Sequence, residues 1–458
     1  MNRTTVCVLV CLLAGCAGET DPDITPDACE GALVDERVNV PLECDELGYL
    51  VKEAGRVGGT EIILAAGSYF IDGDLALKND VILRGEEPGN PPLLQVSGEL
   101  TALNATLQDV IIDGTLDARQ TVLKRVYATK GTVEDVVGSK LEFERLWAYG
   151  EVDLADVTAH KKFVVEGWGR FSGILGESGS MMLLGDSTVF ESQVADLTVR
   201  PETDGRDRVD VVIQETSIHG TLTAHGGTSG TVYVHLEDSE AHGVRIDNDV
   251  RAAAVEVEVL RSVLDGASPA VIDLVEGDNF TLVVTNSLIT GANKLLTTAT
   301  SGEGLAEDAD LSLHNNVFIG GNINFEQAPE CGVSSQTQLN IRNNVFVDVK
   351  LNLTLLLDQT LEASHNLLVD TTCRTCETVA GDECTHSAPR VDLEFEGTEG
   401  TLVASDAGFT DLNLSNPVAS DLTLAAGSPA IDAGVPEWSD PDGSRSDIGL
   451  FGGPDALE

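Results

Sequence analysis

Residues 119–170 concentrate the cations of a strongly acidic chain. This window holds nine of the 27 Lys and Arg residues against eight acids, in a chain whose formal charge is −49. Three of its cations, Arg119, Lys140 and Lys161, are equally spaced along the sequence. Trp147 and Trp168 are separated by the same interval. If one coil of a repetitive fold takes that length, these side chains form a basic and an aromatic column on one wall. An acidic sugar chain needs such a wall, with cations for its carboxylates and aromatic faces for its rings. The alternative is that the charges neutralise neighbouring acids and the tryptophans cover coil edges.

A second group of chemically capable residues is rich in histidine. Half of the eight histidines lie between positions 219 and 242: His219, His225, His235 and His242. His219-Gly220, His242-Gly243 and Asp265-Gly266 repeat at a constant step, which predicts that they stack on consecutive coils. Together with Arg245, they could supply a general base or a metal ligand. The alternative is a set of solvated turn residues before glycine.

Acids gather near the C-terminus, at Asp432, Asp440, Asp442 and Asp447. Asp440-x-Asp442-Gly resembles part of a calcium loop, although the third acid and the bidentate Glu of an EF-hand frame are absent. Ca²⁺ held by Asp440, Asp442 and Asp447 would fasten the last coil, in a structural role. The alternative is a turn closed by hydrogen bonds from the Asp side chains to the backbone.

The N-terminus indicates export. Arg3 precedes an apolar run from Val6 to Leu13, followed by Leu13-Ala14-Gly15-Cys16. This pattern describes a signal peptide over residues 1–15, and a Cys after Leu-Ala-Gly resembles a bacterial lipobox with lipid on Cys16. Ala rather than Asp at position 17 implies transport to the outer membrane of a Gram-negative bacterium, with residues 16–28 as a polar tether. The alternative is an ordinary signal peptide with an incidental Cys.

The remaining cysteines agree with an oxidising compartment. Without the signal and the lipidated residue, six remain: Cys29, Cys44, Cys331, Cys373, Cys376 and Cys384. An even number in an exported chain predicts three disulfides, with Cys29–Cys44 the natural N-terminal pair and the other pairings open. Alternatively, Cys373, Cys376, Cys384 and His386 could hold zinc.

These residues are positioned by a repeat. Units such as LQDVIIDG at 107–114, RNNVFVD at 342–348 and SHNLLVD at 364–370 recur through most of the chain. One polar position in each unit defines a column: Asp109, Asp135, Asp156, Glu177, Asp196, Ser217, Ser239, Ser262, Ser287, Asn316, Asn344 and Asn366. Steps of about 20–30 residues are typical of a solenoid with one repeat per coil. Each unit is too short for a helix pair and rich in β-branched residues, which predicts that the solenoid is built of β-strands.

The chain resembles the right-handed parallel β-helix, or pectate-lyase-like, superfamily over roughly residues 55–458. The resemblance lies in GGTEIILAAGSYFIDGDLALKNDVILRGE at 58–86, in the Asn-Asn-Val-Phe units, and in DLTLAAGSPAIDAG with DPDGSRSDIGLFGG at 421–453. The last stretch is similar to the terminal signature of exported bacterial β-helix proteins. The paired Asp motifs and the terminal Arg-x-Lys of the family's polygalacturonases are absent from this sequence. If the chain is nevertheless a lyase, the candidate base and charge neutraliser are Lys161, Lys162 or Arg170.

The sequence therefore predicts an all-β, right-handed parallel β-helix of about twelve or more coils. A cap at 29–57 precedes the β-helix at 58–420, which includes a Cys-rich loop at 371–386, and a closing segment follows at 421–458. The leading functional hypothesis is a non-catalytic, lipid-anchored surface protein that binds or displays glycan. The alternatives are a polysaccharide lyase or glycoside hydrolase acting on an acidic polysaccharide, and a purely structural spacer. Nucleic acid is excluded as a partner by the charge, since phosphate backbones bind Lys/Arg patches.

Overall fold

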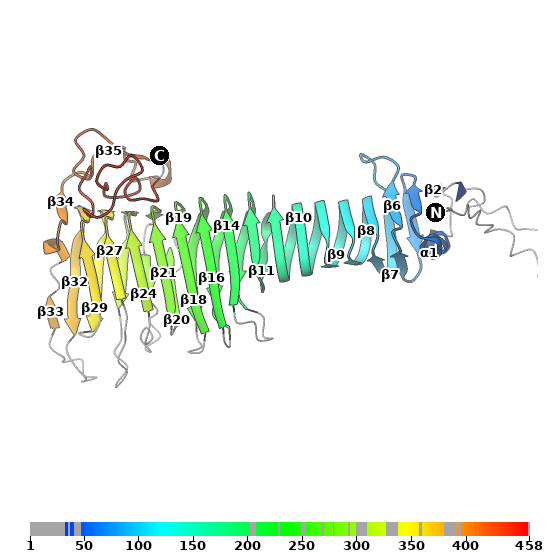
Figure 1. Ribbon diagram of the computed structural model, residues 1–458, viewed down its shortest axis with the longest axis horizontal. Coiled ribbons are helices and arrows are strands. Elements are labelled where there is room, and N and C mark those ends of the chain that lie inside the picture. Colours follow the sequence, from blue (N-terminus) through cyan, green and yellow to red (C-terminus); the bar gives the residue numbers. More distant parts are fainter. Residues whose placement is uncertain are drawn as a thin grey trace, which may run out of the picture. The chain divides into compact units, whose positions relative to one another are not determined.

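The computed structural model describes residues 33–34, 37–40, 47–201, 208–227, 230–248, 253–266, 270–277, 279–291, 294–298, 309–326, 338–356, 360–379, 390–392 and 395–456. The chain divides into two compact units, residues 1–175 and 176–458. In both units nearly all strand pairs are parallel and join consecutive coils (Figure 1). This arrangement confirms the predicted parallel β-helix.

The first unit begins with the antiparallel pair of β1 (Leu33–Val34) and β2 (Arg37–Val40), which joins the long sheet through β3, and with the amphipathic helix α1 (Leu47–Val57). Leu47, Leu50, Val51 and Ala54 of α1 are buried, and the helix packs against β4 and β5. The side chain of Asn79 holds the helix end by donating to the carbonyl of Gly55 at 2.6 Å. The strands of this unit are β1 (Leu33–Val34), β2 (Arg37–Val40), β3 (Glu61–Leu64), β4 (Ser68–Ile71), β5 (Leu75–Lys78), β6 (Ile82–Gly85), β7 (Leu93–Leu103), β8 (Thr106–Arg119), β9 (Val122–Glu134) and β10 (Val137–Ser172).

The coils of β8 to β10 are much shorter than the predicted repeat. Thr106 pairs with Val122, and Val122 pairs with Val137, so that one coil takes only 106–121 and the next only 122–136. Left-handed residues turn the chain at the corners: one column is Asp109, Arg125, Lys140 and Asp156, and another is Asn104, Gln120 and Asp135. Asp109 and Asp135, which the repeat places in one column, therefore lie at different corners.

The second unit has longer coils with three walls. We name the walls by their strands. Wall 1 consists of β12 (Ser187–Phe190), β14 (Arg208–Gln214), β16 (Gly230–Glu237), β18 (Ala253–Leu260), β21 (Phe280–Thr285), β24 (Ala309–His314), β27 (Gln338–Arg342) and β30 (Thr360–Ser364). Wall 2 consists of β20 (Ile272–Gly277), β23 (Lys294–Thr298), β26 (Asn322–Glu326), β29 (Lys350–Leu356) and β32 (Thr372–Val379). Wall 3 consists of β19 (Val263–Asp265), β22 (Leu288–Thr290), β25 (Val317–Ile319), β28 (Val345–Val347), β31 (Leu367–Val369) and β34 (Leu402–Ala404).

Further strands complete the sheet of this unit. The strands β13 (Gln193–Val199), β15 (Ser217–His225) and β17 (Glu240–Asn248) run from wall 3 into wall 2, as the pairing of β17 with both β19 and β20 shows. β11 (Leu175–Leu183) pairs with β13, and β33 (Arg390–Asp392) pairs antiparallel with β32. Figure 1 shows the strands of this unit, green to orange, side by side.

A polar ladder follows the corner between walls 1 and 3. The backbone N–H of Asn316 donates to Oδ1 of Asn344, and that of Asn344 donates to Oδ1 of Asn366, both at 3.0 Å. Hydroxyls take the same place in earlier coils, where Ser239 donates from its backbone to Oγ of Ser262 at 3.2 Å. The predicted column of polar residues is thus confirmed from Ser239 to Asn366, whereas Thr216 rather than Ser217 occupies the coil before.

The C-terminal segment lies along the flank of this unit. After η2 (Phe395–Gly397), β35 (Phe409–Asp411), η3 (Pro417–Ala419) and β36 (Asp421–Leu424), the chain covers wall 3 (Figure 1). Ala430 and Ile448 pack on Val317, Val345 and Leu367 of that wall. Strands β22, β25, β28 and β31 are therefore buried on both faces. The segment expected to close the last coil instead covers an apolar side of several coils.

Candidate functional site

The cations of residues 119–170 do not form the predicted column. The register partner of Arg119 is Glu134, and Lys140 turns a corner one coil after Arg125. Because one coil takes no more than 106–121, the assumed period overshoots it, and positions 119, 140 and 161 lie at different places around the coil. The predicted stack of Arg119, Lys140 and Lys161 is therefore wrong.

The tryptophans of this window do not stack either. Trp147 is half-buried and pairs with Thr132 of the preceding coil, so the equivalent place in the following coil comes well before Trp168. Trp168 is 46% exposed in β10. The predicted aromatic column is wrong for the same reason as the basic one.

Several cations of the window contact acids of the same unit. Arg119 lies 3.2 Å from a carboxylate oxygen of Asp117, and Lys161 lies 2.7 Å from one of Glu144. The ion pair with Lys161 lowers the pKa of Glu144. Lys162 and Arg170, the other lyase candidates, make no ion pair with any residue that the structure describes. Arg119 and Lys161 are exposed, so these two pairs are each worth little, whereas Arg125 of the same window pairs with the buried carboxylate of Asp109.

The histidine column is confirmed by the register of unit 2. Ile218 pairs with Ala241, and Ala241 with Leu264, which brings His219, His242 and Asp265 to equivalent places on consecutive coils. All three side chains are exposed, and no hydrogen bond joins them within the described part of the chain. The stacking of His242 and Asp265 follows from the close approach of the two turns. The turns approach so closely that a Cβ on Gly266 would lie 1.7 Å from the carbonyl oxygen of His242.

Arg245 lies on wall 2 beside two acids. Its guanidinium is 3.4 Å from Oδ2 of Asp247 and 4.0 Å from Oδ2 of Asp273 on the next coil. Asp273 is only 6% exposed, and burial raises the pKa of its carboxyl, against the opposing effects of Arg245 and Lys294. Asp273 is not among the residues predicted from the sequence. The only sign of it there is a charged residue in an alternating strand, one coil after Arg245.

Wall 1 carries three rows of mostly polar side chains. Each strand from β14 to β30 presents one side chain to each of three outward rows. The central row is Val212, His235, Glu258, Val283, Ser312, Asn340 and Glu362. The flanking rows are Asp210, Tyr233, Glu256, Thr281, Asp310, Gln338 and Thr360, and Gln214, Glu237, Leu260, Thr285, His314, Arg342 and Ser364. Because parallel strands lie about 4.8 Å apart, most coils add a polar group to a row at that interval.

A hydrogen-bonded network lies where β16 and β18 contribute to these rows. The hydroxyl of Tyr233 donates to Oε2 of Glu258 at 2.7 Å, and Nδ1 of His235 lies 3.0 Å from the same oxygen. The other ring nitrogen, Nε2 of His235, is 3.5 Å from Oε2 of Glu237. A protonated imidazole in this place would donate to both carboxylates. The His235 side chain is 18% exposed, so the network is partly shielded from solvent.

Neighbouring side chains set the charges of the network. Burial, with the hydrogen bond to Glu258 adding to it, raises the pKa of Tyr233 to about 12, which keeps the phenol protonated at neutral pH. The hydrogen bond from Gln214 and the ion pair with Arg261 lower the pKa of Glu237 and keep it ionised. The site thus combines a proton donor, an ionised carboxylate and, in His235, an imidazole that lies between the carboxylates of Glu237 and Glu258.

The sequence contains only a weak signal for this network. Tyr233, His235 and Glu237 alternate with buried Val232, Val234 and Leu236, as on any solvent-facing strand. Their partner Glu258 belongs to the next coil and is distant in the sequence, and only the coil register brings it beside His235.

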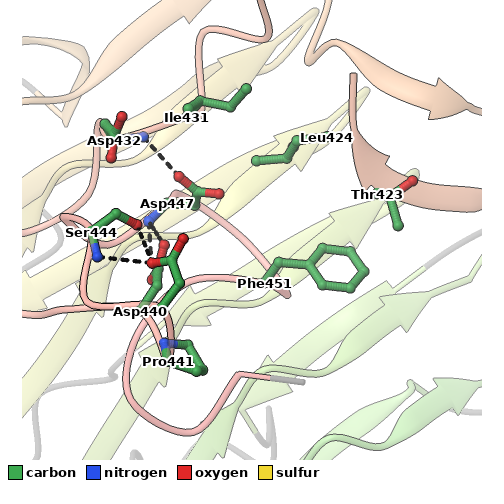
Figure 2. A pocket seen from close by; sticks show the side chains of 10 residues that line it. Thr423, Leu424, Ile431, Asp432, Asp440, Pro441, Ser444, Asp447 and Phe451 are labelled. Carbon is green, nitrogen blue, oxygen red and sulfur yellow. Dashed lines mark hydrogen bonds between the residues drawn. The ribbon is translucent and has the colours of Figure 1, made fainter. Parts of the chain in front are cut away.

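A cleft of about 660 Å³ lies within the C-terminal segment (Figure 2). Leu424, Ile431, Pro441 and Phe451 line it together with the aspartates singled out from the sequence. Within the described residues no three His, Cys, Asp or Glu side chains are grouped to hold a metal ion. The carboxylates bind the backbone instead, as Figure 2 shows for Asp440 and Asp447.

The three predicted calcium ligands form turn contacts. Asp440 accepts from the backbone N–H of Gly453 at 2.7 Å and of Asp447 at 3.0 Å, and Asp442 accepts from that of Ser444 at 2.8 Å. Burial raises the pKa of both Asp440 and Asp447. Asp440, Asp442 and Asp447 thus form the turn held by Asp side chains rather than an assembled calcium site.

Most residues of the lipidation, disulfide and zinc predictions lie outside the described residues. They are Cys16, Cys29, Cys44, Cys331, Cys384 and His386. Cys373 and Cys376 both lie in β32, and Cys373 is disulfide-bonded, which leaves it no thiolate for zinc. In the part of the chain that the structure describes, no helix is long and apolar enough to cross a membrane.

Comparisons with solved structures find parallel β-helix proteins at low identity. The A-module of the Azotobacter vinelandii mannuronan C-5 epimerase AlgE6 matches 82% of this chain and 97% of its own, at 13% identity and a TM-score of 0.33. The A-module of AlgE4 from the same organism matches 72% of this chain and 96% of its own, at 14% identity and a TM-score of 0.25. Pectate lyase Pel9A matches 88% of this chain and 90% of its own, at 15% identity and a TM-score of 0.21. No family model and no curated protein matches the chain. The fold is therefore assigned from the strand register, and a function can be argued only from the geometry of the site itself.

Proposed function

We propose that this chain is an exported surface protein, anchored by lipid on Cys16 at the outer membrane, that binds a glycan along wall 1. The observation that supports the proposal best is the network of Tyr233, His235, Glu237 and Glu258 within three rows of polar side chains. A spacer needs no such network, since charged and hydroxyl groups on a wall keep a protein soluble whether or not they are hydrogen-bonded to one another.

The regular spacing of wall 1 favours a polymeric ligand. Successive coils place hydroxyl, amide or carboxylate groups at about 4.8 Å from those of the coil before. Ser312, Asn340 and Glu362 are successive examples in the central row. A chain of sugars presents hydroxyls along its whole length, and such groups both donate to carboxylates and accept from amides.

The charge of wall 1 favours a neutral or amino-bearing glycan over an acidic one. Carboxylates of Asp210, Glu237, Glu256, Glu258, Asp310 and Glu362 outnumber the cations on the three rows. The cations nearest the network are engaged: Arg208 lies 2.6 Å from Asp210, and Arg261 pairs with Glu237 and Asp238. A polyuronate approaching this surface would be repelled.

The experiment is affinity electrophoresis of the purified protein through gels that contain one polysaccharide each. The panel holds a neutral glucan, a polyglucosamine and a polyuronate. We expect retardation by the first or second and none by the third. Glu258→Gln and His235→Asn should each reduce retardation about tenfold or more, because each loses hydrogen bonds to a charged group. Lys161→Ala, in the window that the sequence favoured, is the matched control and should behave like the wild type. Equal retardation of all variants would remove wall 1 from consideration.

A second candidate function is acid–base chemistry on a bound glycan. It is favoured by one observation, the contact of a protonated phenol and an imidazole with the same carboxylate oxygen, since general acid–base catalysis needs such positioned groups. The test is a depolymerisation assay that follows reducing ends and the absorbance of unsaturated ends on the same polysaccharides. New ends that disappear in Tyr233→Phe would establish an enzyme; retardation without new ends would leave the binding function alone.

A further inference from the structure

The surface between wall 3 and the C-terminal strap, residues 430–453, contains a row of left-handed corner residues. The row comprises Asn286, Asn315, Asn343 and His365, with φ between 49° and 59°. The asparagines hold the strap. Asn286 donates to the carbonyls of Leu450 and Gly452 at 2.7 and 2.8 Å, and Oδ1 of Asn343 accepts from the N–H of Val435 at 2.8 Å. In the last coil of the row, a titratable ring takes the place of the amide.

Two imidazoles lie along this strap, His365 buried and His314 half-buried. His365 is 6% exposed, and its Nδ1 has no hydrogen-bond partner among the residues that the structure describes. His314, at the end of β24, contacts the Trp438 ring of the strap edge-on at 5.3 Å. Its Nε2 is buried and has no hydrogen-bond partner within the described part of the chain. A proton on either ring would therefore be poorly solvated while the strap is docked.

The groups around His365 oppose its protonation on balance. Arg445 of the strap and Arg342 of β27 repel a positive ring, whereas Glu399 of the turn before β34 and Glu437 of the strap attract it. Burial is the largest effect and, with the arginines, lowers the pKa of His365. Around His314, Asn340 and Arg342 come from the next coil and Trp438 from the strap, and burial lowers its pKa as well.

We propose that the C-terminal strap is a pH-sensitive latch, which protonation of His314 and His365 in acid releases from wall 3. When the strap leaves, both rings meet water and bind protons with their ordinary pKa of 6.5. The released form then binds more protons than the docked form. As the pH falls below that value, the ratio of released to docked strap rises by up to about tenfold per pH unit for each histidine.

Release has a defined structural effect. It uncovers the outward side chains of Val317, Val345 and Leu367, which Ala430 and Ile448 cover in the docked form. Asp440 and Asp447 within the strap act in the opposite sense at lower pH, because burial raises their pKa. The latch is therefore confined to the range just below the ordinary pKa of histidine.

The experiment uses Trp438 as the reporter in a Trp147→Phe/Trp168→Phe background. Its emission is followed from about pH 8 to about pH 5, the range of histidine titration. In parallel, brief proteolysis with mass mapping counts cuts within residues 430–453. We expect both signals to change together with a midpoint below 6.5. A change in emission without new cuts would mean that His314 titrates in a docked strap, and would overturn the latch.

The decisive variant removes both titratable rings and keeps the ring contact with Trp438. His314→Phe keeps an aromatic ring against Trp438, and His365→Asn places at the corner the residue that the preceding coils carry. The double variant should lose the acid-induced cuts, whereas His219→Asn, an exposed histidine, should keep them. Should the double variant not fold by circular dichroism, Glu399→Gln gives a second test: it removes a group that attracts the proton of His365 in the docked form, and should move release to higher pH. An unchanged midpoint in Glu399→Gln, or unchanged cuts in a folded double variant, would overturn the proposal.

Discussion

The hydroxyl of Tyr233 donates to the carboxylate oxygen Oε2 of Glu258 at 2.7 Å, across two successive coils of wall 1. His235 uses the same oxygen, so Glu258 joins an aromatic proton donor to an imidazole. The strand register alone brings these groups together. Their energetic coupling can be measured without knowing the ligand.

Glu258→Gln should lower the pKa of Tyr233 from about 12, because a neutral amide no longer stabilises the phenol proton electrostatically. Burial remains, so the pKa should stay above its ordinary value of 10.0. Absorbance of the tyrosinate during alkaline titration measures the shift, with Tyr233→Phe identifying the transition. A Tyr233 transition unchanged in Glu258→Gln would mean that burial alone sets its pKa.

Asn343→Ala should loosen the C-terminal segment. The variant loses the hydrogen bonds from Val435 N–H and to Oγ of Ser446, and it places alanine at a φ of 59°. We expect a loss of about 3 kcal/mol, from buried groups left unpaired and from the left-handed backbone. Asn343→Gly is the control, because it keeps the backbone relaxed and should lose about 1–2 kcal/mol less than Asn343→Ala. Chemical denaturation followed by Trp438 emission gives the values, and equal losses would show that backbone strain contributes nothing.

Gly266→Ala should disrupt the stacking of His242 and Asp265. The added Cβ would lie 1.7 Å from the carbonyl oxygen of His242, so one coil must move against its neighbour. A loss of about 3 kcal/mol or more is expected from such overpacking against backbone. Gly48→Ala in α1 is the matched control: its Cβ meets nothing within 4 Å, and helix propensity should stabilise it by up to about 1 kcal/mol. Thermal unfolding of both variants tests the pair, and a stable Gly266→Ala protein would contradict this coil spacing.

Asp440→Asn should change how stability depends on pH. Burial raises the folded pKa of Asp440 above 3.8, so its contribution is fully present below that pH and is lost as the pH rises through the folded pKa. Asparagine keeps an oxygen for the N–H of Gly453 without the buried charge. The variant should therefore be more stable than the wild type at neutral pH, with little difference near pH 3.8. Denaturant unfolding at the two pH values decides, and an advantage confined to acid would reverse the sign.

Cys16→Ser should free the exported protein from the membrane fraction, if lipid on that residue is the anchor. The expected result is full-length protein in the soluble extracellular or periplasmic fraction, detected by immunoblot. Cys11→Ser, within the predicted signal peptide, is the control and should leave the protein on the membrane. Membrane retention of Cys16→Ser would contradict the proposed anchor.

The fold was predictable wherever turn residues repeat once per coil. Asn316, Asn344 and Asn366 lie in one ladder because each must satisfy the backbone N–H of the coil before it. In unit 1 the same inference failed, since polar residues turn short coils at more than one corner. Asp109 and Asp135 occupy different corners, and a spacing counted between them mixes two columns. Because the period counted from the sequence is too long, the cations predicted to form one column lie at different places around the coil.

The candidate site was less predictable than the fold. His219 and His242 share a corner motif with glycine and were predicted to stack, whereas His235 lies mid-strand and has no such signature. Its partners Glu237 and Glu258 are ordinary solvent-side acids in the sequence. Only the side-chain distances distinguish this network from the other acids of the chain.

The polar ladder also bears on how such a chain changes length during evolution. Each rung from Ser239 to Ser287 satisfies the coil before it in the same way, through a hydroxyl that accepts a backbone N–H of that coil. Deleting the coil from Ser239 to Arg261 would bring Ser262 to the position of Ser239, with the bond to Thr216 preserved. Duplicating that coil would extend the ladder by one identical rung. Whole coils are thus the natural unit of insertion and loss, and homologues of different lengths should differ by multiples of a coil in this region.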